Sequence, residues 1–352
     1  MKTMMQALVI EGSNQITVKE VPKPCPHGNE VLIKVKACGI CGSDIPRALQ
    51  DGAHFYPLIL GHEFAGEVVA VGEEANDVPL GQRVTAAPLI PCGKCSACEA
   101  GLPAMCAAYS FLGSRQDGAM AEFVLVPKKN LIPLAEHVSF EAAATIEPLT
   151  VAIHGVERAG LLRSGTSAII LGCGTIGLMT LAVLKAKGIA RVYAVDIDAK
   201  KLAIAKQMGA HAVLDSRTQD IKDFCQQQGG IDVVFETSGV PMLQALALEL
   251  AAPRGKVVYI GTAHGEVKLA PQSFERILRH ELMVTGSWMS FSAPFPGTEW
   301  RAAAEFLAEG KVQPELLITH RYSLTEGRKA FETLTDKNAG AIKVMFVEKA
   351  RL

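Results

Sequence analysis

The most constraining feature of the sequence is the uncharged run from Ser164 to Leu184, which has the motif G-x-G-x-x-G at its centre. Its first half, TSAIILG, is typical of a strand, and its second half, GLMTLAVL, is typical of a helix. The run of 21 residues is long enough to cross a membrane, but its glycines interrupt any continuous helix, which lipid would require. We therefore predict a buried strand, a tight turn and a helix.

The rest of the chain shows two different rhythms. From about Val151 onward, nearly continuous apolar runs of strand length alternate with helix-like segments. This alternation predicts a parallel sheet covered by helices on both faces, here over residues 151–289. The first 150 residues instead contain short strand-like runs separated by Pro, Gly and Asn, which predicts a β-rich domain. A length of 352 residues agrees with two domains.

Composition excludes several functional classes. The 35 Lys and Arg residues balance 36 Asp and Glu residues, so no overall field favours nucleic acid or an anionic membrane as a partner. The nine cysteines are an odd number, mostly crowded into the first third, and no signal-peptide pattern accompanies them. We expect a cytoplasmic protein that uses its cysteines for metal rather than for disulfides.

The glycine motif predicts a dinucleotide site. Gly172 would turn the chain, Gly174 would let the backbone approach a pyrophosphate, and Gly177 would pack the helix on the strand. Asp196 ends the next predicted strand 19 residues later, where a carboxylate binds ribose hydroxyls and repels a 2′-phosphate. This carboxylate favours NAD over NADP. The alternative for the motif as a whole is a turn whose glycines serve packing alone. The residues expected to bind NAD are Gly172, Gly174, Thr175, Ile176, Gly177, Asp196 and Lys201. Lys201 could instead be a solvent-exposed lysine on a helix.

A four-cysteine loop carries a strong metal signal. Its ligands follow the spacing C-x2-C-x2-C-x7-C at Cys92, Cys95, Cys98 and Cys106. Four thiolates so close together match a closed tetrahedral zinc site, with an iron–sulfur cluster or two disulfides as the alternatives. Because a closed site has no position for substrate, its role would be structural.

A second group of metal-binding residue types is dispersed along the sequence. It comprises Cys41 in ACGICGSD, His62 and Glu63 in LGHEFAGEVV, and Glu147 in IEPLTVAIHG. An open catalytic zinc takes three protein ligands from these residue types. Each residue, taken singly, also has an interpretation without metal. Cys41 could be a small apolar side chain in the core, His62 a hydrogen-bonded loop histidine, and Glu147 a carboxylate at the start of a helix. Spacing alone does not bring these residues together.

The ordered motifs C-G-S-D, G-H-E-x-x-G, the four-cysteine loop and G-x-G-x-x-G together resemble the zinc-dependent medium-chain alcohol and polyol dehydrogenases over essentially the whole chain. The resemblance implies an α/β protein with a GroES-like catalytic domain, residues 1–150 plus 290–352, and a Rossmann NAD-binding domain, residues 151–289. It also implies that the final strand rejoins the first domain.

The same resemblance implies two zinc ions per chain. Cys41 and His62 match the catalytic zinc ligands, and Glu147 matches the third ligand of the polyol branch. Glu63 would approach the metal during ligand exchange. Ser43 would pass the substrate's proton outward, with a turn-forming serine as its alternative. The four-cysteine loop matches the family's structural zinc site.

The implied reaction is the oxidation of a secondary hydroxyl with NAD⁺. Several segments, such as CGSDIPRALQDGAHFYP and FLGSRQDGAMAEF, resemble dehydrogenases of polyol phosphates within the polyol branch. A phosphate needs cationic partners, for which Arg115, Arg47 and His54 are the candidates, with surface charges or internal ion pairs as the alternative. Pro46 stands where many relatives carry a histidine, so the outer proton path differs from theirs.

Alternative functions remain open at this point. An unphosphorylated polyol, a vicinal diol or threonine would use the same zinc and NAD. A non-catalytic NAD-binding and zinc-binding scaffold would need only the four-cysteine loop. The family resemblance further implies a small-molecule substrate and a homodimer or homotetramer.

Overall fold

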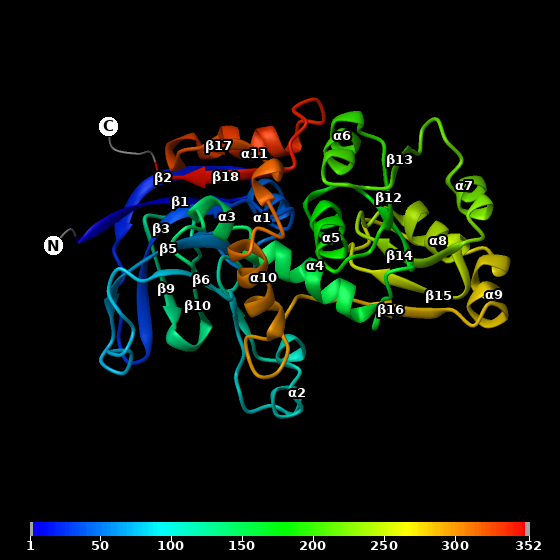
Figure 1. Ribbon diagram of the computed structural model, residues 1–352. Coiled ribbons are helices and arrows are strands. Elements are labelled where there is room, and N and C mark those ends of the chain that lie inside the picture. Colours follow the sequence, from blue (N-terminus) through cyan, green and yellow to red (C-terminus); the bar gives the residue numbers. More distant parts are fainter. Residues whose placement is uncertain (1–2, 349–352) are drawn as a thin grey trace. The chain divides into compact units, whose positions relative to one another are not determined.

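The computed structural model describes residues 3–348. The chain divides into two compact units, Met1–Glu147 with Ser290–Leu352 and Pro148–Met289 (Figure 1). Helix α4 (Ile146–Arg158) begins in the first unit and continues into the second. The limits of independently folding domains, 1–150 with 290–352 and 151–289, stay a prediction.

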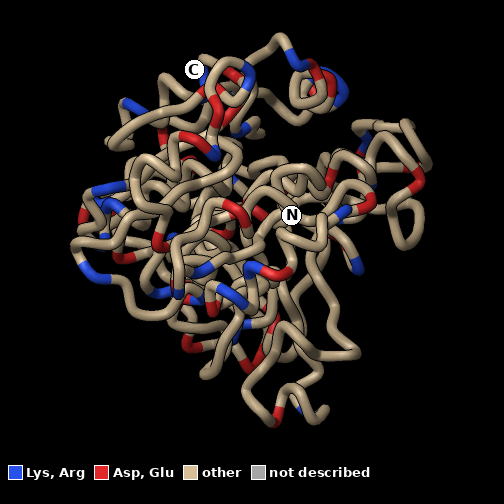
Figure 2. The backbone as a smooth tube through the Cα atoms, turned by 90° about the vertical axis from the view of Figure 1, so that its right-hand side faces the viewer, with Lys and Arg blue, Asp and Glu red and all other residues tan. Residues whose placement is uncertain are grey.

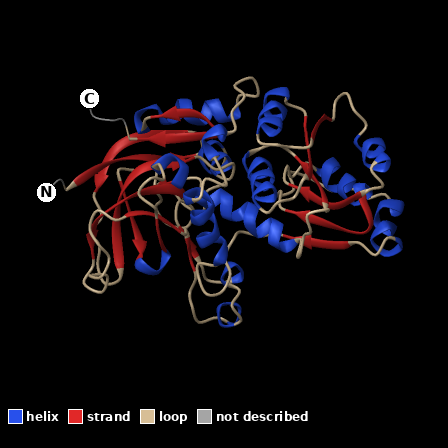
Figure 3. Cartoon of the chain, in the orientation of Figure 1, coloured by secondary structure: helices blue, strands red, loops and turns tan. Residues whose placement is uncertain are grey.

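The first unit is built mainly from strands, as Figure 3 shows. Its strands are β1 (Met4–Gly12), β2 (Gln15–Pro22), β3 (Glu30–Gly39), β4 (Leu58–Ile59), β5 (Glu63–Val71), β6 (Arg83–Ala86), β7 (Leu89–Ile90), β8 (Ser110–Phe111), β9 (Phe123–Pro127), β10 (Leu131–Pro133), β17 (Ile318–Tyr322) and β18 (Lys343–Val347). Its helices are α1 (Asp44–Leu49), α2 (Ser96–Glu99), α3 (Phe140–Ala143), α10 (Thr298–Ala308) and α11 (Gly327–Thr335).

Strand β3 lies at the centre of the main sheet, which has the order β10-β6-β5-β3-β18-β17 with β9 also paired to β3. The last strand, β18, pairs antiparallel with β3, so the end of the chain rejoins the first sheet as the family resemblance implied. A smaller sheet has the order β2-β1-β4. This arrangement places segments from both ends of the sequence beside β3.

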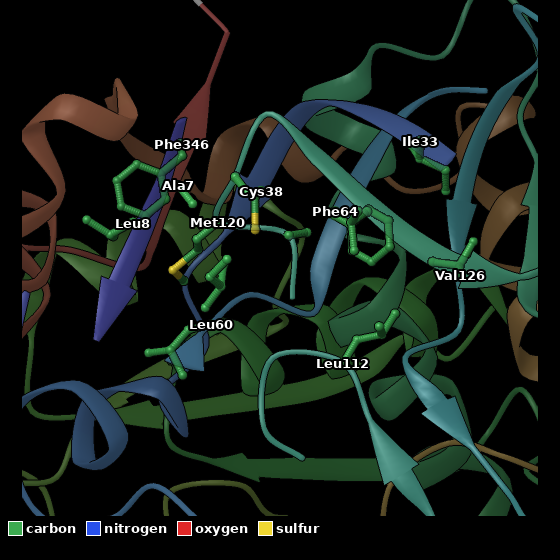
Figure 4. Close-up of a cluster of buried hydrophobic side chains, with 14 of the residues drawn as sticks. Ala7, Leu8, Ile33, Cys38, Leu60, Phe64, Leu112, Met120, Val126 and Phe346 are labelled. Carbon is green, nitrogen blue, oxygen red and sulfur yellow. The ribbon is translucent and has the colours of Figure 1, made fainter. Parts of the chain in front are cut away.

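Apolar side chains from these strands form one continuous core (Figure 4). Cys38 on β3 pairs in register with Phe64 on β5 and with Phe346 on β18, and all three are buried. Burying each of the two phenylalanine side chains stabilises the unit by about 1.5–3 kcal/mol. The core thereby fixes the register of β3 and β5, whose adjoining ends carry the candidate metal ligands.

The second unit is a parallel sheet flanked by helices (Figure 3). Its elements are β11 (Ser167–Leu171), α5 (Thr175–Ala186), β12 (Arg191–Asp196), α6 (Ala199–Gln207), β13 (Ala212–Asp215), α7 (Ile221–Gln227), β14 (Ile231–Glu236), α8 (Pro241–Leu250), β15 (Ala251–Tyr259), α9 (Pro271–Arg279) and β16 (Met283–Gly286). The strand order is β13-β12-β11-β14-β15-β16. Strands that follow β11 in the chain are added first on one side of it, up to β13, and then on the other, from β14 onward. Doubly wound sheets bind ligands at such a switch point. The predicted parallel sheet is confirmed.

The uncharged run Ser164–Leu184 contains β11, the glycine turn and most of α5, as predicted. Within residues 3–348 no helix has both the length and the apolar character needed to cross a bilayer. Acidic and basic residues are interspersed along the backbone (Figure 2). Helices α4 and α9 each have a proline in the first turn, where the missing N–H costs no hydrogen bond.

Candidate active site

Two strand ends bring three potential metal ligands together. Strand β3 ends at Gly39, which pairs in register with Glu63 at the start of β5. Cys41 follows β3 by two residues and His62 precedes β5 by one, so both lie at the same edge of the sheet. The ligand atoms of Cys41, His62 and Glu63 lie within 4.8 Å of one another. The β3–β5 register thus assembles residues that the sequence spacing does not.

The site is rich in acidic groups and largely buried, although Cys41 itself is half-buried. Burial, reinforced by the carboxylates of Glu63 and Asp44, raises the pKa of the Cys41 thiol to about 11. Burial also raises the pKa of Glu147 to about 8, against the attraction of His62 and with the repulsion of Glu63 and Cys41. Glu147 therefore belongs to the same electrostatic cluster, although it is not among the three atoms closest together. A divalent cation would stabilise the charged forms of these groups.

The donor set of this site fits zinc. It offers a thiol, an imidazole and carboxylates, which are the ligand types that zinc takes in catalytic sites. Among the described residues, neither Nδ1 of His62 nor Oδ1 of Asp44 has a hydrogen-bond partner, and these two atoms are 3.7 Å apart. Buried polar atoms without a partner cost free energy, so the site is better satisfied with a ligand than without one.

Asp44 was not predicted as a site residue. Its side chain is fully buried at the start of α1, and Oδ2 accepts a hydrogen bond of 3.0 Å from the backbone N–H of Cys41. Oδ1 lies 3.7 Å from Nη1 of Arg47. Asp44 therefore fixes the loop that carries Cys41, and its place three residues after that cysteine was the available signal.

Lys343 was also missed by sequence reasoning. It is 2% exposed on β18, and its Nζ lies 2.5 Å from Oε2 of Glu63 and 3.0 Å from the carbonyl oxygen of Ile40. Burial lowers the pKa of Lys343, but the nearby Glu63 and Cys41 more than offset this, so its pKa is raised overall and it carries a charge. The only signal in the sequence was a lone lysine in the apolar strand IKVMFVE.

Ser43 lies between Cys41 and Asp44 at the start of α1. Nη1 of Arg47 donates hydrogen bonds to the carbonyl oxygen of Ser43 at 2.8 Å and to its Oγ at 2.9 Å. Arg47, expected as a phosphate contact, thus binds the serine expected to carry the proton. Both bonds use Nη1, so Nε and Nη2 of Arg47 take no part in them.

The other two expected phosphate contacts lie on separate loops. The guanidinium of Arg115 lies over the ring of Tyr109, with its Cζ 4.4 Å from the ring centroid, and the backbone N–H of Arg115 donates to the carbonyl oxygen of Phe111. Phe111 meets His62 edge-on, with ring centroids 5.5 Å apart. The Arg115 loop is therefore joined to the metal-ligand group through Phe111. His54 is exposed on the loop that precedes β4.

The four-cysteine loop forms the second metal-ligand group. The Sγ atoms of Cys92, Cys95, Cys98 and Cys106 all lie within 4.8 Å of one another. Hydrogen bonds from the Cys98 backbone and side chain outweigh desolvation and lower the pKa of Cys95 to about 6. Four converging thiols match the closed tetrahedral coordination of a structural zinc. The predicted structural site is thus consistent with the geometry.

The glycine turn joins β11 to α5. Gly172 has φ 101°, a left-handed conformation that favours glycine, and a Cβ at Gly177 would overlap the carbonyl oxygen of Gly172. Asp196 ends β12, and its Oδ2 accepts a hydrogen bond of 2.6 Å from the backbone N–H of Cys173. The turn, the first N–H groups of α5 and this carboxylate match the arrangement by which dinucleotide sites bind phosphate and ribose.

Family models match both units. One describes an alcohol dehydrogenase GroES-like domain and matches residues 27–136, and one describes a zinc-binding dehydrogenase and matches residues 175–309. The chain belongs to the zinc-dependent alcohol and polyol dehydrogenase family. The predicted fold class, a GroES-like domain with a Rossmann domain, is confirmed, as are zinc and a nicotinamide dinucleotide as its cofactors.

Relatives within this family extend over nearly the whole chain. Galactitol 1-phosphate 5-dehydrogenase of Escherichia coli (strain K12) is 38% identical over 97% of this chain and 100% of its own length. Its crystal structure matches with a TM-score of 0.93, covering 98% of this chain and 100% of that one. Sorbitol dehydrogenase of Bacillus subtilis (strain 168) is 33% identical over 97% of this chain and 96% of its own length. A putative zinc-binding dehydrogenase of Sinorhizobium meliloti 1021 bound to NADP, 33% identical, matches with a TM-score of 0.91 over 99% of this chain and 100% of that one.

We expect Asp196→Ala to reduce the preference for NADH over NADPH by at least about tenfold, because the variant loses a hydrogen-bond acceptor for the ribose and the repulsion of a 2′-phosphate. The preference is the ratio of the two dissociation constants, measured by fluorescence titration. Loosening of the glycine turn would weaken both cofactors, so the ratio isolates the effect of charge. The control is Asp220→Ala, which removes the capping carboxylate of α7. An unchanged ratio in Asp196→Ala would contradict the assignment.

Proposed function

We propose that this chain is an NAD⁺-dependent zinc dehydrogenase that oxidises a secondary hydroxyl of a polyol phosphate, a reaction of the galactitol 1-phosphate to tagatose 6-phosphate type. The observation that carries this proposal is the buried, acidic group of metal ligands around Cys41 and His62. The phosphorylated substrate is supported by the 38% identity to galactitol 1-phosphate 5-dehydrogenase. Bound zinc would lower the pKa of the substrate hydroxyl so that hydride can leave to NAD⁺.

In this proposal Cys41, His62 and Glu147 hold the catalytic zinc, and the four-cysteine loop holds the structural one. Ser43 accepts the proton of the substrate hydroxyl and passes it toward solvent. Arg47 supports this role because it donates to Oγ of Ser43, which leaves the serine's own hydrogen free to bond elsewhere. Pro46 has no group that can relay a proton, so the path beyond Ser43 does not pass through this position.

Arg115 is the proposed phosphate contact that the packing supports best. Its guanidinium lies over the ring of Tyr109, a contact that does not use its N–H donors. Its loop reaches the metal-ligand group through Phe111. Arg47 and His54 remain further candidates for the same phosphate.

We expect Arg115→Ala to raise KM for the phosphorylated substrate by about tenfold or more while kcat changes less, because a lost charge-assisted hydrogen bond costs about 1.5–3 kcal/mol of binding. The matched control is Arg163→Ala, an arginine of the other unit. Steady-state kinetics with phosphorylated and unphosphorylated polyols provide the measurement. An unchanged KM would remove Arg115 from the substrate site.

The proposed reaction is tested by the near-ultraviolet absorbance of NADH while a panel of polyols and polyol phosphates is offered with NAD⁺. Galactitol 1-phosphate is expected to give the highest kcat/KM. The identity of 33% to sorbitol dehydrogenase makes an unphosphorylated polyol the second candidate, which a higher kcat/KM for sorbitol would favour. No turnover with any member of the panel by a zinc-loaded protein would favour a scaffold instead.

We also propose a homo-oligomer that assembles through the edge of the parallel sheet. Strand β16 is the last strand of this sheet in the described part of the chain, and Met283 on it is 55% exposed. Phe274 and Leu278 on the neighbouring α9 are 61% and 79% exposed. An open strand edge beside exposed apolar side chains is typical of an interface. Light scattering that gives the mass of a single chain would contradict this proposal.

A further inference from the structure

Lys343 is a buried ammonium group that the proposed reaction does not use. Its two partners are the carboxylate of Glu63, 2.5 Å away, and the carbonyl oxygen of Ile40, 3.0 Å away. Glu63 itself is 1% exposed. A lysine is almost never fully buried unless it is paired, because desolvating its charge is costly. The carboxylate of Glu63 therefore compensates the buried charge of Lys343.

Three adjacent strands are built around this ion pair. Glu63 begins β5, Lys343 begins β18, and Gly39 at the end of β3 lies between them in the sheet. A Cβ at Gly39 would overlap the Glu63 carboxylate and would also contact Cδ of Lys343. Glycine at this position thus leaves the space that the pair occupies.

Glu63 is close enough to the metal-ligand group to compete for the metal. One of its carboxylate oxygens lies within 4.8 Å of the ligand atoms of both Cys41 and His62. If Glu63 joined these two residues and Glu147, the metal would have four protein ligands. Such closed coordination is typical of structural zinc, whereas catalytic zinc keeps one position open.

We propose that Lys343 is a positioning residue whose ammonium group holds the Glu63 carboxylate back from the metal, so that the fourth coordination position stays open for substrate. The hydrogen bond to Ile40 fixes the ammonium group next to the loop that carries Cys41. The two charges of the pair have opposite sign, so Glu63 and Lys343 together add no net charge to the site. The inference rests on the proposed function only in assigning that position to substrate.

The test is the rate at which a chelator removes the catalytic zinc. The catalytic zinc is identified as the ion that the wild-type protein binds and the Cys41→Ser variant lacks. In Lys343→Met, Glu63 becomes a fourth ligand, and we expect zinc release to slow by at least about tenfold and kcat to fall. Lys343→Arg keeps the cation and is expected to restore both values in large part. Adding Glu63→Gln to Lys343→Met is expected to return zinc release to the rate of Glu63→Gln alone.

Three outcomes would overturn the proposal: faster zinc release in Lys343→Met, slow release that persists in the double variant, or equal loss of kcat in Lys343→Arg. If Lys343→Met does not fold, Glu63→Gln alone decides the matter. An unchanged release rate in that variant supports the proposal, and tenfold faster release shows that Glu63 already binds the metal. A protein that follows the expected zinc-release pattern but oxidises no polyol phosphate contradicts the proposed function and leaves the role of Lys343 intact.

Discussion

Cys41→Ser is expected to lower kcat by at least about 1,000-fold, equivalent to about 4 kcal/mol of lost transition-state stabilisation. Serine is a poor zinc ligand at neutral pH, and Cys41 is the only thiol of the proposed catalytic site. The fold is expected to persist, because Cys41 lies in a loop beyond β3 rather than in the apolar core. NADH absorbance measures the rate, and zinc analysis is expected to show one ion per chain instead of two.

The matched control for this variant is Cys38→Ala. Cys38 lies three residues earlier, is 1% exposed and belongs to the apolar core rather than to a metal-ligand group. We expect it to lower stability while both zinc ions and turnover remain. Substantial turnover by Cys41→Ser, or zinc loss in Cys38→Ala, would contradict the assignment of the catalytic site.

Cys106→Ala is expected to remove the other zinc ion and to lower the melting temperature by at least about 5 °C. The loop from Cys92 to Cys106 has few buried apolar side chains of its own, and three of its four cysteines are only half-buried. The ordered conformation of this loop therefore depends on the metal. Loss of the zinc ion is expected to make the loop sensitive to protease. Differential scanning calorimetry and limited proteolysis measure the two effects.

Cys225→Ala is the control for the loss of a buried thiol. Cys225 is 1% exposed in the core of the second unit and belongs to no metal-ligand group among the described residues. It is expected to keep both zinc ions and the protease resistance of the four-cysteine loop. If Cys106→Ala kept two zinc ions, the four-cysteine site would not be a zinc site.

Features confined to a short stretch of sequence could be predicted closely. The dinucleotide turn needs only β11, three glycines and the start of α5, all within the run Ser164–Leu184. The four cysteines of the structural site span 15 residues and converge within one loop. In both cases local backbone geometry brings the functional groups together, so residue type and spacing carry nearly all of the information.

The catalytic group depends on contacts between distant parts of the chain. The sequence motifs, through their family resemblance, pointed to Cys41, His62 and Glu147 as ligands, but their approach depends on the register of β3 with β5 and on the start of α4. Asp44 was quoted in a motif without a role, because its contact with the Cys41 backbone exists only in the folded loop.

By itself the sequence determined the alternation of strands and helices in the second unit, the glycine turn and the residue types available for two metal sites. Only the tertiary structure decided which carboxylates surround Cys41 and which cation accompanies them. Lys343 and Glu63 are 280 residues apart in sequence, and pairing of β18 and β5 with β3 brings them together. Periodicity reports local conformation, whereas the burial of a charge beside its partner depends on the packing of the whole sheet.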